Sequence, residues 1–228
     1  MLAAWLFESV GVSRVAAMTH PDNSASVRVA ERIGMVFEGH TRNSYWVGDE
    51  NSDDWIFAMT RDDWMAWIGR STTAPGSVAL IEVTPSNLGR VDELATHRSQ
   101  QRFVSPMAAS FADALVPAPH HGHRVVPWYR AIEADGEIVG FVMATEPTPE
   151  LPVPYLWRLL IDRLHQRRGI GGRVVDLLIE RVRSLGAEAL DVSWGEGPGS
   201  PAAFYLARRF EPTGEIDDGE IVARRALS

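Results

Sequence analysis

The sequence contains no cysteine, and this absence limits the chemistry available to the protein. It excludes disulfide bonds and a thiolate nucleophile, and it is typical of a cytoplasmic protein. An apolar run of about 18 residues, the length that crosses a bilayer, is also absent, so we expect no membrane partner. The first residues, "MLAAWLFESVG", lack the basic segment of a secretory signal, and none is expected.

Basic residues are in the minority, because 22 Lys and Arg stand against 30 Asp and Glu and give a net charge of −8. This balance disfavours nucleic acid, whose binding requires neutralised phosphates, and it weakly favours cationic partners. A local basic patch in such an acidic chain indicates a small anionic ligand. The patch consists of Arg158, Arg163, Arg167, Arg168 and Arg173.

The chain has 228 residues, enough for one large domain or for one domain plus a fragment. A linker is predicted at 69–77, "GRSTTAPGS", because this segment is rich in Gly, Ser, Thr and Pro and has no periodic apolar pattern. The predicted linker separates residues 1–68 from residues 78–228.

The larger segment alternates strand and helix patterns. "ADGE" near its centre is typical of a hairpin turn between two strands. Apolar residues at three- and four-residue spacing predict an amphipathic helix from Gly172 to about Leu185. Strands mixed with helices, antiparallel hairpins included, indicate an α/β (α+β) domain. The other expected elements are strands at 78–84, 155–161, 188–194 and 220–227, helices from Ser86 or Asn87 to about Arg102, at 105–116 and at 200–209, and a loop at 117–127.

A glycine-rich turn, "QRRGIGG" from Gln166 to Gly172, joins the expected strand 155–161 to the helix that follows. Glycine allows positive φ and lets the backbone approach a ligand closely. Free N–H groups at a helix start form an anion site, to which flanking arginines add charge-assisted hydrogen bonds. A plain strand-to-helix turn is the alternative. The turn lacks the Lys-Ser/Thr of a Walker A loop, and it comes too late in the chain for a dinucleotide fingerprint.

Two motifs together resemble the GCN5-related N-acetyltransferases, or GNAT proteins. "QRRGIG" matches that family's pyrophosphate loop, Q/R-x-x-G-x-G/A, and "AAFYLARRF" is similar to its late helix, A-x-x-F-Y-x-x-x-G-F. The resemblance covers 78–228 and implies a complete GNAT domain with a central mixed, mostly antiparallel sheet flanked by helices. Segments such as "WRLLIDRLHQRRGIG" are similar to bacterial diamine and polyamine acetyltransferases.

The resemblance implies acetyl-CoA (coenzyme A) as the acetyl donor and no metal. The pyrophosphate would rest on backbone N–H groups from Arg167 to Gly172, with Arg168 and Arg173 touching phosphates. The pantetheine arm would pair with the strand backbone at 159–161. The implied cofactor-binding residues are Leu160, Ile161, Gln166, Arg167, Arg168, Gly169, Ile170, Gly171, Gly172 and Arg173.

The implied reaction is direct attack of a neutral amine on the thioester, and the departing thiolate needs an acid. Tyr205 is the candidate, because a phenol with a pKa near 10 stays protonated at neutral pH. The alternative is that Tyr205 only packs against Phe204 and Phe210. Glu146 is the candidate base, acting through water, unless it is a surface carboxylate. Asp162 is expected either to orient an arginine or to touch substrate.

Two positions depart from the family pattern, and a histidine cluster needs an explanation. Pro198 stands where the family often has a cofactor-contacting Asn, and Arg209 replaces the glycine of the late helix. His120, His121 and His123 have a spacing compatible with a metal, but no carboxylate joins them locally. We therefore expect a solvated loop that rims the acceptor site.

Residues 1–68 resemble the C-terminal half of a second GNAT domain. "NSASVRVAERIGMVFEG" aligns with "PGSPAAFYLARRFEPTG" at a constant offset, which places Ala30 where Tyr205 stands. No pyrophosphate loop precedes it, since Met1 would begin partway through the helix after such a loop. A truncated, degenerate and inactive half-domain is therefore predicted. We expect its open sheet edge to be covered by the C-terminal domain or by a second protomer in a homodimer.

Together these patterns predict an acetyl-CoA-dependent N-acetyltransferase that acts on a primary amine of a small molecule, such as a polyamine. Two other interpretations stay open: a non-catalytic acyl-CoA-binding regulatory protein, and a protein or peptide N-acetyltransferase. Retention of Tyr205 beside an intact loop favours an enzyme.

Overall fold

The computed structural model describes residues 2–227, and these form two compact units. The first unit consists of residues 2–71 with His97–Ser99, and the second of residues 72–96 with 100–227. The boundary after Ser71 lies inside the segment 69–77. Within residues 2–227, no helix is both long and apolar enough to cross a membrane.

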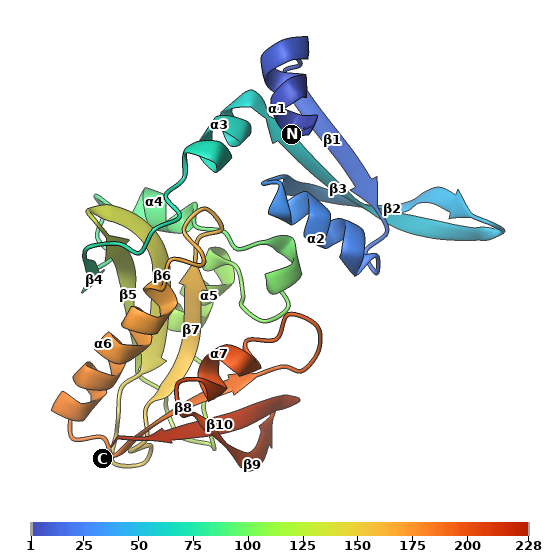
Figure 1. Cartoon of the computed structure of the whole chain (residues 1–228). Helices are drawn as coiled ribbons and strands as arrows, with labels where there is room; N and C mark the ends of the chain where they lie inside the picture. The colour runs from blue at the N-terminus through green and yellow to red at the C-terminus, as the bar shows by residue number, and fades with distance from the viewer. Residues whose placement is uncertain (1, 228) are drawn as a thin grey trace. The chain divides into compact units, whose positions relative to one another are not determined.

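The second unit is built on a seven-stranded sheet (Figure 1). Its strand order is β4-β5-β6-β7-β8-β10-β9. Every neighbouring pair is antiparallel except β7 and β8, which run parallel. This arrangement confirms the predicted fold class. The strands are β4 (Val78–Ile81), β5 (Pro127–Ala134), β6 (Glu137–Thr145), β7 (Tyr155–Ile161), β8 (Ala189–Trp194), β9 (Glu211–Asp217) and β10 (Glu220–Ala226).

The β5–β6 hairpin follows from its turn residues. Asp135 and Gly136 both have positive φ, 52° and 83°. This is the backbone of a type I′ turn, which Asp-Gly adopts easily and which matches the twist of paired strands. The register pairs Ala134 with Glu137 across the turn, as the "ADGE" pattern predicted.

Helices cover both faces of this sheet (Figure 1). α6 (Ile170–Ser184) packs its apolar side on one face, together with Val142 of β6. α4 (Leu88–Asp92) and α5 (Met107–Leu115) pack on the other face, together with Phe141. Neighbouring residues of β6 therefore belong to different cores, because side chains alternate along a strand.

β7 and β8 separate after a short parallel contact. In the part of the chain that the structure describes, this pairing joins Tyr155 to Asp191 and Leu156 to Val192. Next to it, the β6–β7 register shifts by one residue at Trp157, which is a β-bulge. A bulge bends the strand and increases its twist. The two strands consequently diverge beyond Leu156.

The helix expected to reach Arg102 is shorter, because α4 ends at Asp92. Hydrogen bonds to the loop after β7 hold the following residues outside the helix. The N–H of Ala95 donates to Asp162 Oδ2 at 3.1 Å, and its carbonyl accepts from the N–H of Arg163 at 2.8 Å. These partners are distant in sequence, so the local pattern does not reveal them. The turn η2 (Arg98–Gln100) and the helix α7 (Ala202–Leu206) complete the helical elements of this region.

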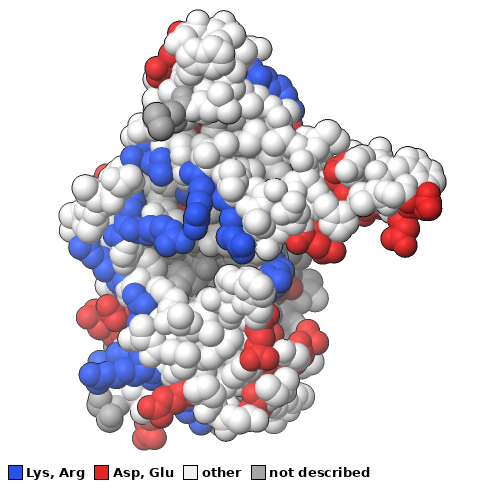
Figure 2. All heavy atoms as spheres, turned by 45° about the vertical axis from the view of Figure 1, so that its right-hand side comes forward, with Lys and Arg blue, Asp and Glu red and all other residues white. Residues whose placement is uncertain are grey.

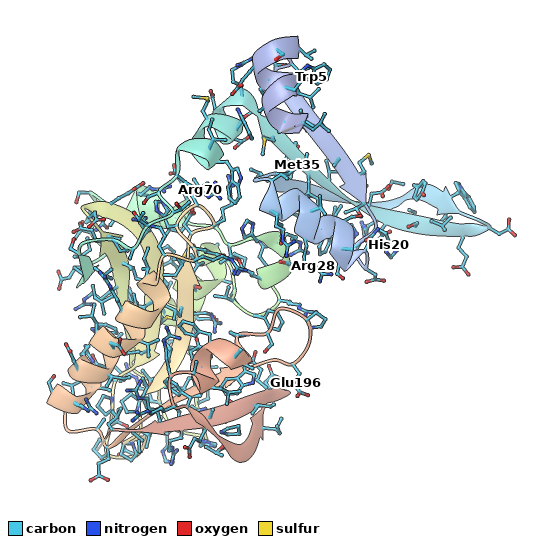
Figure 3. All side chains as sticks on the ribbon, in the orientation of Figure 1. Trp5, His20, Arg28, Met35, Arg70 and Glu196 are labelled. Carbon is cyan, nitrogen blue, oxygen red and sulfur yellow. The ribbon has the colours of Figure 1, made fainter. Side chains whose placement is uncertain are left out.

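The first unit holds a three-stranded antiparallel sheet in the order β1-β3-β2. Phe7, Val27 and Phe57 are almost fully buried in its core, whereas Trp5 is 55% exposed (Figure 3). The N–H and hydroxyl of Ser99 donate to the buried carboxylate of Glu31 at 2.8 and 2.7 Å. The elements are α1 (Leu2–Ala4), η1 (Trp5–Val10), β1 (Arg14–Thr19), α2 (Ser24–Arg32), β2 (Val36–Val47), β3 (Glu50–Thr60) and α3 (Arg61–Gly69).

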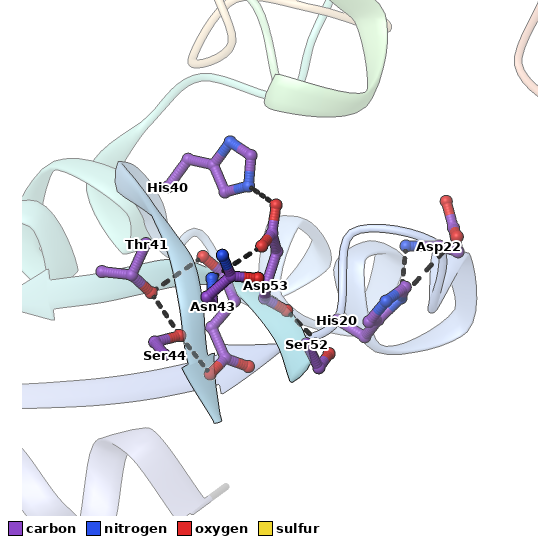
Figure 4. Close-up of polar contacts among 9 residues, drawn as sticks. His20, Asp22, His40, Thr41, Asn43, Ser44, Ser52 and Asp53 are labelled. Atoms are coloured by element: carbon purple, nitrogen blue, oxygen red, sulfur yellow. Dashed lines mark hydrogen bonds and ion pairs between the residues drawn. The ribbon is translucent and has the colours of Figure 1, made fainter. Parts of the chain in front are cut away.

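A polar cluster holds an irregular part of the β2–β3 hairpin (Figure 4). The register shifts between Thr41 and Tyr45. Asp53 closes this bulge, accepting from the N–H of Asn43 at 2.8 Å and lying 2.7 Å from His40 Nε2. The backbone hydrogen bond, and secondly His40, hold the pKa of Asp53 below its ordinary value. Since the Ser44 hydroxyl bonds to another carboxylate, that of Asp54, the cluster is a structural support and not a catalytic triad.

Candidate active site

A cavity of about 1020 Å³ lies in the second unit, where β7 and β8 diverge. It is bordered by β7, the start of α6, the end of β8, α7 and the β9–β10 turn. Figure 2 shows acidic side chains at the tip of the β2–β3 hairpin. The arginines that line the cavity are Arg102, Arg158, Arg167 and Arg208.

The loop before α6 presents its backbone to this cavity. Arg167 and Gly169 have positive φ, 61° and 79°, so the chain turns sharply into the helix. Gly169 is the residue before the helix and provides no side-chain cap to it. The first N–H groups of α6 therefore face the cavity beside Gly171 and Gly172, and such groups attract an anion.

Arg208 lies against this helix start and was not predicted as a site residue. A β-carbon built on Gly172 would collide with Arg208 Nη2, so the guanidinium rests on the glycine backbone. Its Nη1 donates to the carbonyl of Phe204 at 2.9 Å, and it stacks 3.8 Å from that ring. The helix dipole disfavours a cation at a helix N-terminus unless an anion lies between them. The arrangement therefore suits a phosphate.

The side chains of Arg168 and Arg173 do not line the cavity, contrary to the expected phosphate contact. Arg168 Nε donates to the carbonyl of Thr73 at 2.8 Å, and Arg173 Nη1 donates to the carbonyl of Pro75 at 2.7 Å. Arg168 is buried and also lies 3.1 Å from His165 Nδ1. Both guanidinium groups thus hold the linker backbone, and what these positions offer to a ligand is their main chain.

The strand beside the loop differs between its two expected residues. Ile161 lines the cavity. The Leu160 side chain is buried with Phe141 on the α4–α5 face, so this residue contributes only its backbone. Gln166 Nε2 donates to the Ile161 carbonyl at 3.0 Å and to Gln100 Oε1 at 2.9 Å. The Gln166 amide therefore ties the loop to the strand.

Tyr205 of α7 lines the cavity and is buried among aromatic rings. Its ring stacks on Trp194 at 5.8 Å and meets the edges of Phe204 and Phe210 at 5.0 and 5.6 Å. Burial, with a smaller contribution from Tyr155, raises the pKa of the Tyr205 hydroxyl above its ordinary value. The phenol consequently stays protonated throughout the physiological range and remains a proton donor.

Glu146, the expected base, is not among the residues that line the cavity. Its Oε1 lies 2.5 Å from Arg181 Nη2 on α6, and Arg181 in turn stacks over Trp128. This ion pair occupies the carboxylate on the α6 side of the sheet, so the geometry gives no support to a base at this position. Asp162 is buried and accepts from the N–H groups of Ala95 and Leu164, which makes it a loop support.

The end of the cavity near the β9–β10 turn carries three residues that the sequence patterns did not single out. Tyr155, Ser193 and Glu220 all line it. The Ser193 hydroxyl donates to Glu220 Oε2, and Ser193 is close enough to Tyr155 to act on its pKa. Burial raises the pKa of Tyr155 to about 12. The one available signal was the strand alternation, which places Tyr155, Asp191 and Ser193 on one face of the sheet.

The loop predicted at 117–127, which carries His120, His121 and His123 and is called the histidine loop below, reaches the same end of the cavity. His120 lines it, with its ring 5.7 Å from that of Tyr155 and its Nδ1 3.9 Å from Asp217 Oδ2. His121 Nε2 lies 3.5 Å from Glu215 Oε1. Within residues 2–227, no three His, Cys, Asp or Glu side chains are grouped so that they could hold a metal ion.

The two departures from the late-helix pattern have visible consequences. The Pro198 carbonyl accepts from Arg102 Nη2, and the neighbouring Gly199 packs on Phe103, so this loop is fixed by side chains of the α4–α5 segment. Arg209 has φ 62°, the left-handed backbone for which glycine is preferred. The Arg209 backbone therefore has the conformation that the glycine of the family pattern adopts easily.

Comparison with known proteins bears on both units. The model of the acetyltransferase (GNAT) family matches residues 90–208, and a second model, of an acetyltransferase (GNAT) domain, matches residues 1–36. A search among curated proteins gives no match.

Solved structures of acetyltransferases are similar in fold to this chain. An acetyltransferase from Thermus thermophilus is 22% identical and covers 68% of this chain and 99% of its own, with a TM-score of 0.51. An acetyltransferase of the GNAT family from Desulfovibrio desulfuricans, described as putative, is 19% identical over 67% of this chain and 100% of its own, with a TM-score of 0.51. The PaiA N-acetyltransferase from Thermoplasma acidophilum, solved with coenzyme A, is 11% identical over 66% and 99%, with a TM-score of 0.49.

The first of these family models spans more than half of the chain, including the glycine loop, α6 and Tyr205. The chain belongs to the acetyltransferase (GNAT) family and is an N-acetyltransferase that uses acetyl-CoA as acetyl donor.

Proposed function

We propose that this enzyme transfers the acetyl group to a primary amine of a small molecule, with a polyamine as the favoured acceptor class. The observation that carries the proposal is a cavity with an anion-binding end and an acidic end. The anion-binding end is formed by the helix start at Gly169–Gly172 and by Arg208. The acidic end is formed by Asp217, Asp218 and Glu220.

The residues at the anion-binding end fit the pyrophosphate of acetyl-CoA. Gly171 and Gly172 leave the backbone bare, and Arg208 supplies the positive charge. Arg167, Gly169 and Ile170 contribute backbone N–H groups of the loop, and Ile161 the neighbouring strand edge. Acetyl-CoA supplies an acyl group activated as a thioester. We assign the phosphate side-chain contact to Arg208 instead of Arg168 and Arg173, whose side chains hold the linker.

Tyr205 is the proposed acid of this reaction. It lies in the cavity lining on the helix that leads to Arg208. Its raised pKa keeps the proton on the phenol until a thiolate, a much stronger base than the thioester sulfur, develops beside it. The buried aromatic surroundings also fix the direction in which the hydroxyl points.

The acidic end supports a cationic acceptor. Alkyl ammonium groups are attracted to carboxylates, and Asp217, Asp218 and Glu220 stand together at the turn between β9 and β10. The net charge of −8 acts in the same direction at longer range. The similarity of the second unit's segments to polyamine acetyltransferases adds to this support.

The test is release of coenzyme A thiol from acetyl-CoA with putrescine, spermidine, spermine, aminoglycosides, amino acids and short peptides as acceptors. Because the chain contains no cysteine, a thiol reagent reports only the released coenzyme A. Two variants accompany the wild type. Tyr205→Phe should lower kcat by about 100-fold at unchanged acetyl-CoA affinity, since general acid catalysis contributes about 10²–10⁴-fold. Arg208→Gln should weaken acetyl-CoA binding by about 10-fold or more, as expected for a lost charge-assisted hydrogen bond.

The neighbouring Arg209→Gln is the matched control, because Arg209 is exposed and lies on the same helix end as Arg208. It should leave the acetyl-CoA affinity unchanged. Turnover with peptides alone would replace the small-molecule acceptor by a protein acceptor. The chain contains no lysine, so side-chain acetylation of the enzyme itself does not confuse that readout. Tight acetyl-CoA binding without turnover for any acceptor would overturn the proposed acceptor class.

For residues 2–71 the proposal is a non-catalytic partial GNAT domain. In its sheet β1 and β2 are the edge strands, and Ala30, at the place corresponding to Tyr205, is a buried core residue without a proton to donate. If the second unit covers a sheet edge, the protein is a monomer. If another copy of the chain covers it, the protein is a homodimer. Light scattering of the full chain over a range of concentrations distinguishes the two.

A further inference from the structure

The structure points to a proton acceptor for the reaction that is different from Glu146. We propose that Glu220 takes up the proton that the acceptor ammonium loses, relayed by the hydroxyls of Ser193 and Tyr155. This inference rests on the proposed function, because it concerns the acceptor end of the same cavity. It follows from the position of Tyr155 next to Ser193 on the paired strands and from the hydrogen bond that Ser193 donates to Glu220.

The three residues are brought together by strand pairing. Tyr155 lies opposite Asp191 in the short parallel contact, and Ser193 is two residues further along β8. Side chains two residues apart point to the same face, so Ser193 stands next to Tyr155. Ser193 pairs with Val222 of β10, and Glu220 precedes Val222 by two residues, which places its carboxylate beside the Ser193 hydroxyl.

The relay formed by Tyr155, Ser193 and Glu220 lies close to Tyr205, the proposed acid. Both Glu220 and Tyr155 are near enough to act electrostatically on Tyr205, and all three line one cavity. Tyr155 is half-buried beneath the histidine loop, and Glu220 is partly exposed at the start of β10. The relay therefore runs from the enclosed part of the cavity to a carboxylate from which water removes the proton.

The proton balance requires such a group. An alkyl ammonium must lose one proton before its nitrogen can attack. The nitrogen–carbon bond then forms while the carbon–sulfur bond breaks. The second proton lost by nitrogen balances the proton that Tyr205 gives to the leaving sulfur, so one proton in all is released to solvent. Glu220 accounts for this released proton.

Other charged groups surround Glu220 and define the alternatives. Asp191 on β8 is engaged by Arg224, whose Nε and Nη2 lie 2.7 Å from its two carboxylate oxygens. Asp217 lies 3.9 Å from His120 Nδ1. Asp218 is exposed at the tip of the turn. His120, which lines the cavity, is therefore the competing base.

The experiment is the pH dependence of kcat/KM for the full-length chain with its best amine acceptor. Glu220→Gln keeps the shape of the side chain but removes the base. We expect its kcat/KM to fall by about 100-fold near pH 7. The loss should shrink about tenfold per pH unit as the pH rises toward about 10, where alkylamines lose their proton in solution. Ser193→Ala and Tyr155→Phe should show the same rescue at high pH.

Glu211→Gln is the matched control, since it is the same substitution on the neighbouring strand β9, at an exposed carboxylate that does not line the cavity. It should keep the wild-type profile. An equal loss for Glu220→Gln at every pH, or a profile altered in His120→Gln and not in Glu220→Gln, would overturn the proposal. If the wild type acetylates no amine, the proposed function fails and the relay with it. If the wild type is active and Glu220→Gln is unimpaired, the relay alone fails. Thermal unfolding of each variant establishes that it is folded.

Discussion

Arginine has two different tasks around the start of α6 in this enzyme. Arg208 stacks on Phe204 and places its charge at the start of α6. Arg168 and Arg173 turn away and bind the backbone carbonyls of Thr73 and Pro75. A guanidinium has five N–H donors, and in Arg168 and Arg173 some of these donors bind the protein's own carbonyls. Side-chain identity in a basic patch is therefore a weaker guide to phosphate contacts than backbone geometry.

The left-handed backbone at Arg209 leads to a prediction about stability. A non-glycine residue at φ 62° is disfavoured by about 1 kcal/mol, and the exposed Arg209 side chain gains little in return. Arg209→Gly should therefore raise the free energy of unfolding by up to about 1 kcal/mol and the melting temperature by about 2–4 °C. Calorimetry measures both.

Ala207→Gly is the control for this prediction. Ala207 is also exposed, but its φ is −63°, an ordinary helical value that gives glycine no advantage. That substitution should destabilise the protein by up to about 1 kcal/mol. A loss of stability in Arg209→Gly of the same size would show that the turn is not strained.

At the scale of elements, the loop between β7 and α6 is held in place by His165, which also lines the cavity. His165 is buried, with Nδ1 3.1 Å from Arg168 Nη1 and Nε2 3.6 Å from Glu137 Oε1. Since Arg168 only donates, His165 Nδ1 accepts, and the imidazole is held in its neutral form. Burial is the main cause that lowers the pKa of His165 below its ordinary value.

This histidine gives the protein an acid-sensitive stability. The pKa of His165 is lower in the folded protein than in the unfolded chain. Below about pH 6.5 the unfolded chain therefore binds a proton that the folded protein does not yet bind, and the free energy of unfolding falls as the pH drops toward the folded pKa. Urea unfolding at pH 7.5 and 5.5 should show a smaller loss for His165→Asn, whose Oδ1 also accepts from Arg168. The exposed His123→Asn should lose as much as the wild type. Equal losses in all three proteins would contradict this role.

Local patterns predicted those elements that their own residues determine. The β5–β6 hairpin depends on Asp135-Gly136, and α6 on its apolar periodicity, and both lie where expected. The end of α4 depends instead on bonds between Ala95 and the Asp162 loop, which no local pattern contains. β9, with its exposed residues and a Pro and Gly, shows no alternation and was missed.

The candidate site divides in the same way. The glycine loop and Tyr205 carry motifs and were predicted, and their positions in the cavity lining follow from the fold. Ser193 and Glu220 come from strands that meet only in the folded sheet, so their contact is a property of register. Glu146 lies at the end of the predicted strand, but its partner on α6 could be identified only from the packing.

At the scale of the whole molecule, the linker belongs physically to the catalytic unit. Residues 72–77 lie in the second unit, where Arg168 and Arg173 hold the carbonyls of Thr73 and Pro75, and Asp135 Oδ1 accepts from the N–H of Ser77. A buried arginine that loses its acceptor costs about 1–3 kcal/mol. The linker is thus a fixed part of the acetyltransferase fold.

We therefore expect two shortened proteins to differ. One that begins at Thr72 keeps both carbonyls, whereas one that begins at Val78 removes them and leaves the guanidinium groups of Arg168 and Arg173 without these partners. The longer protein should melt several degrees higher and bind acetyl-CoA more tightly, because the loop that carries Arg168 also forms the proposed anion site. Thermal unfolding and calorimetric titration of both proteins measure this. Equal melting temperatures would mean that the hydrogen bonds from Arg168 and Arg173 to this tether, residues 72–77, add nothing to the stability of the fold.

The same tether has a consequence for how such a gene can be rearranged during evolution. Fusion and recombination succeed most easily where the join falls in flexible chain, and by composition the segment 69–77 looks like such a place. Here a join after Thr73 would replace the residue whose carbonyl accepts the hydrogen bond from Arg168. The heritable module is longer than the domain that its motifs outline, and in relatives that lack the first unit a short N-terminal extension should offer the same two carbonyls to Arg168 and Arg173.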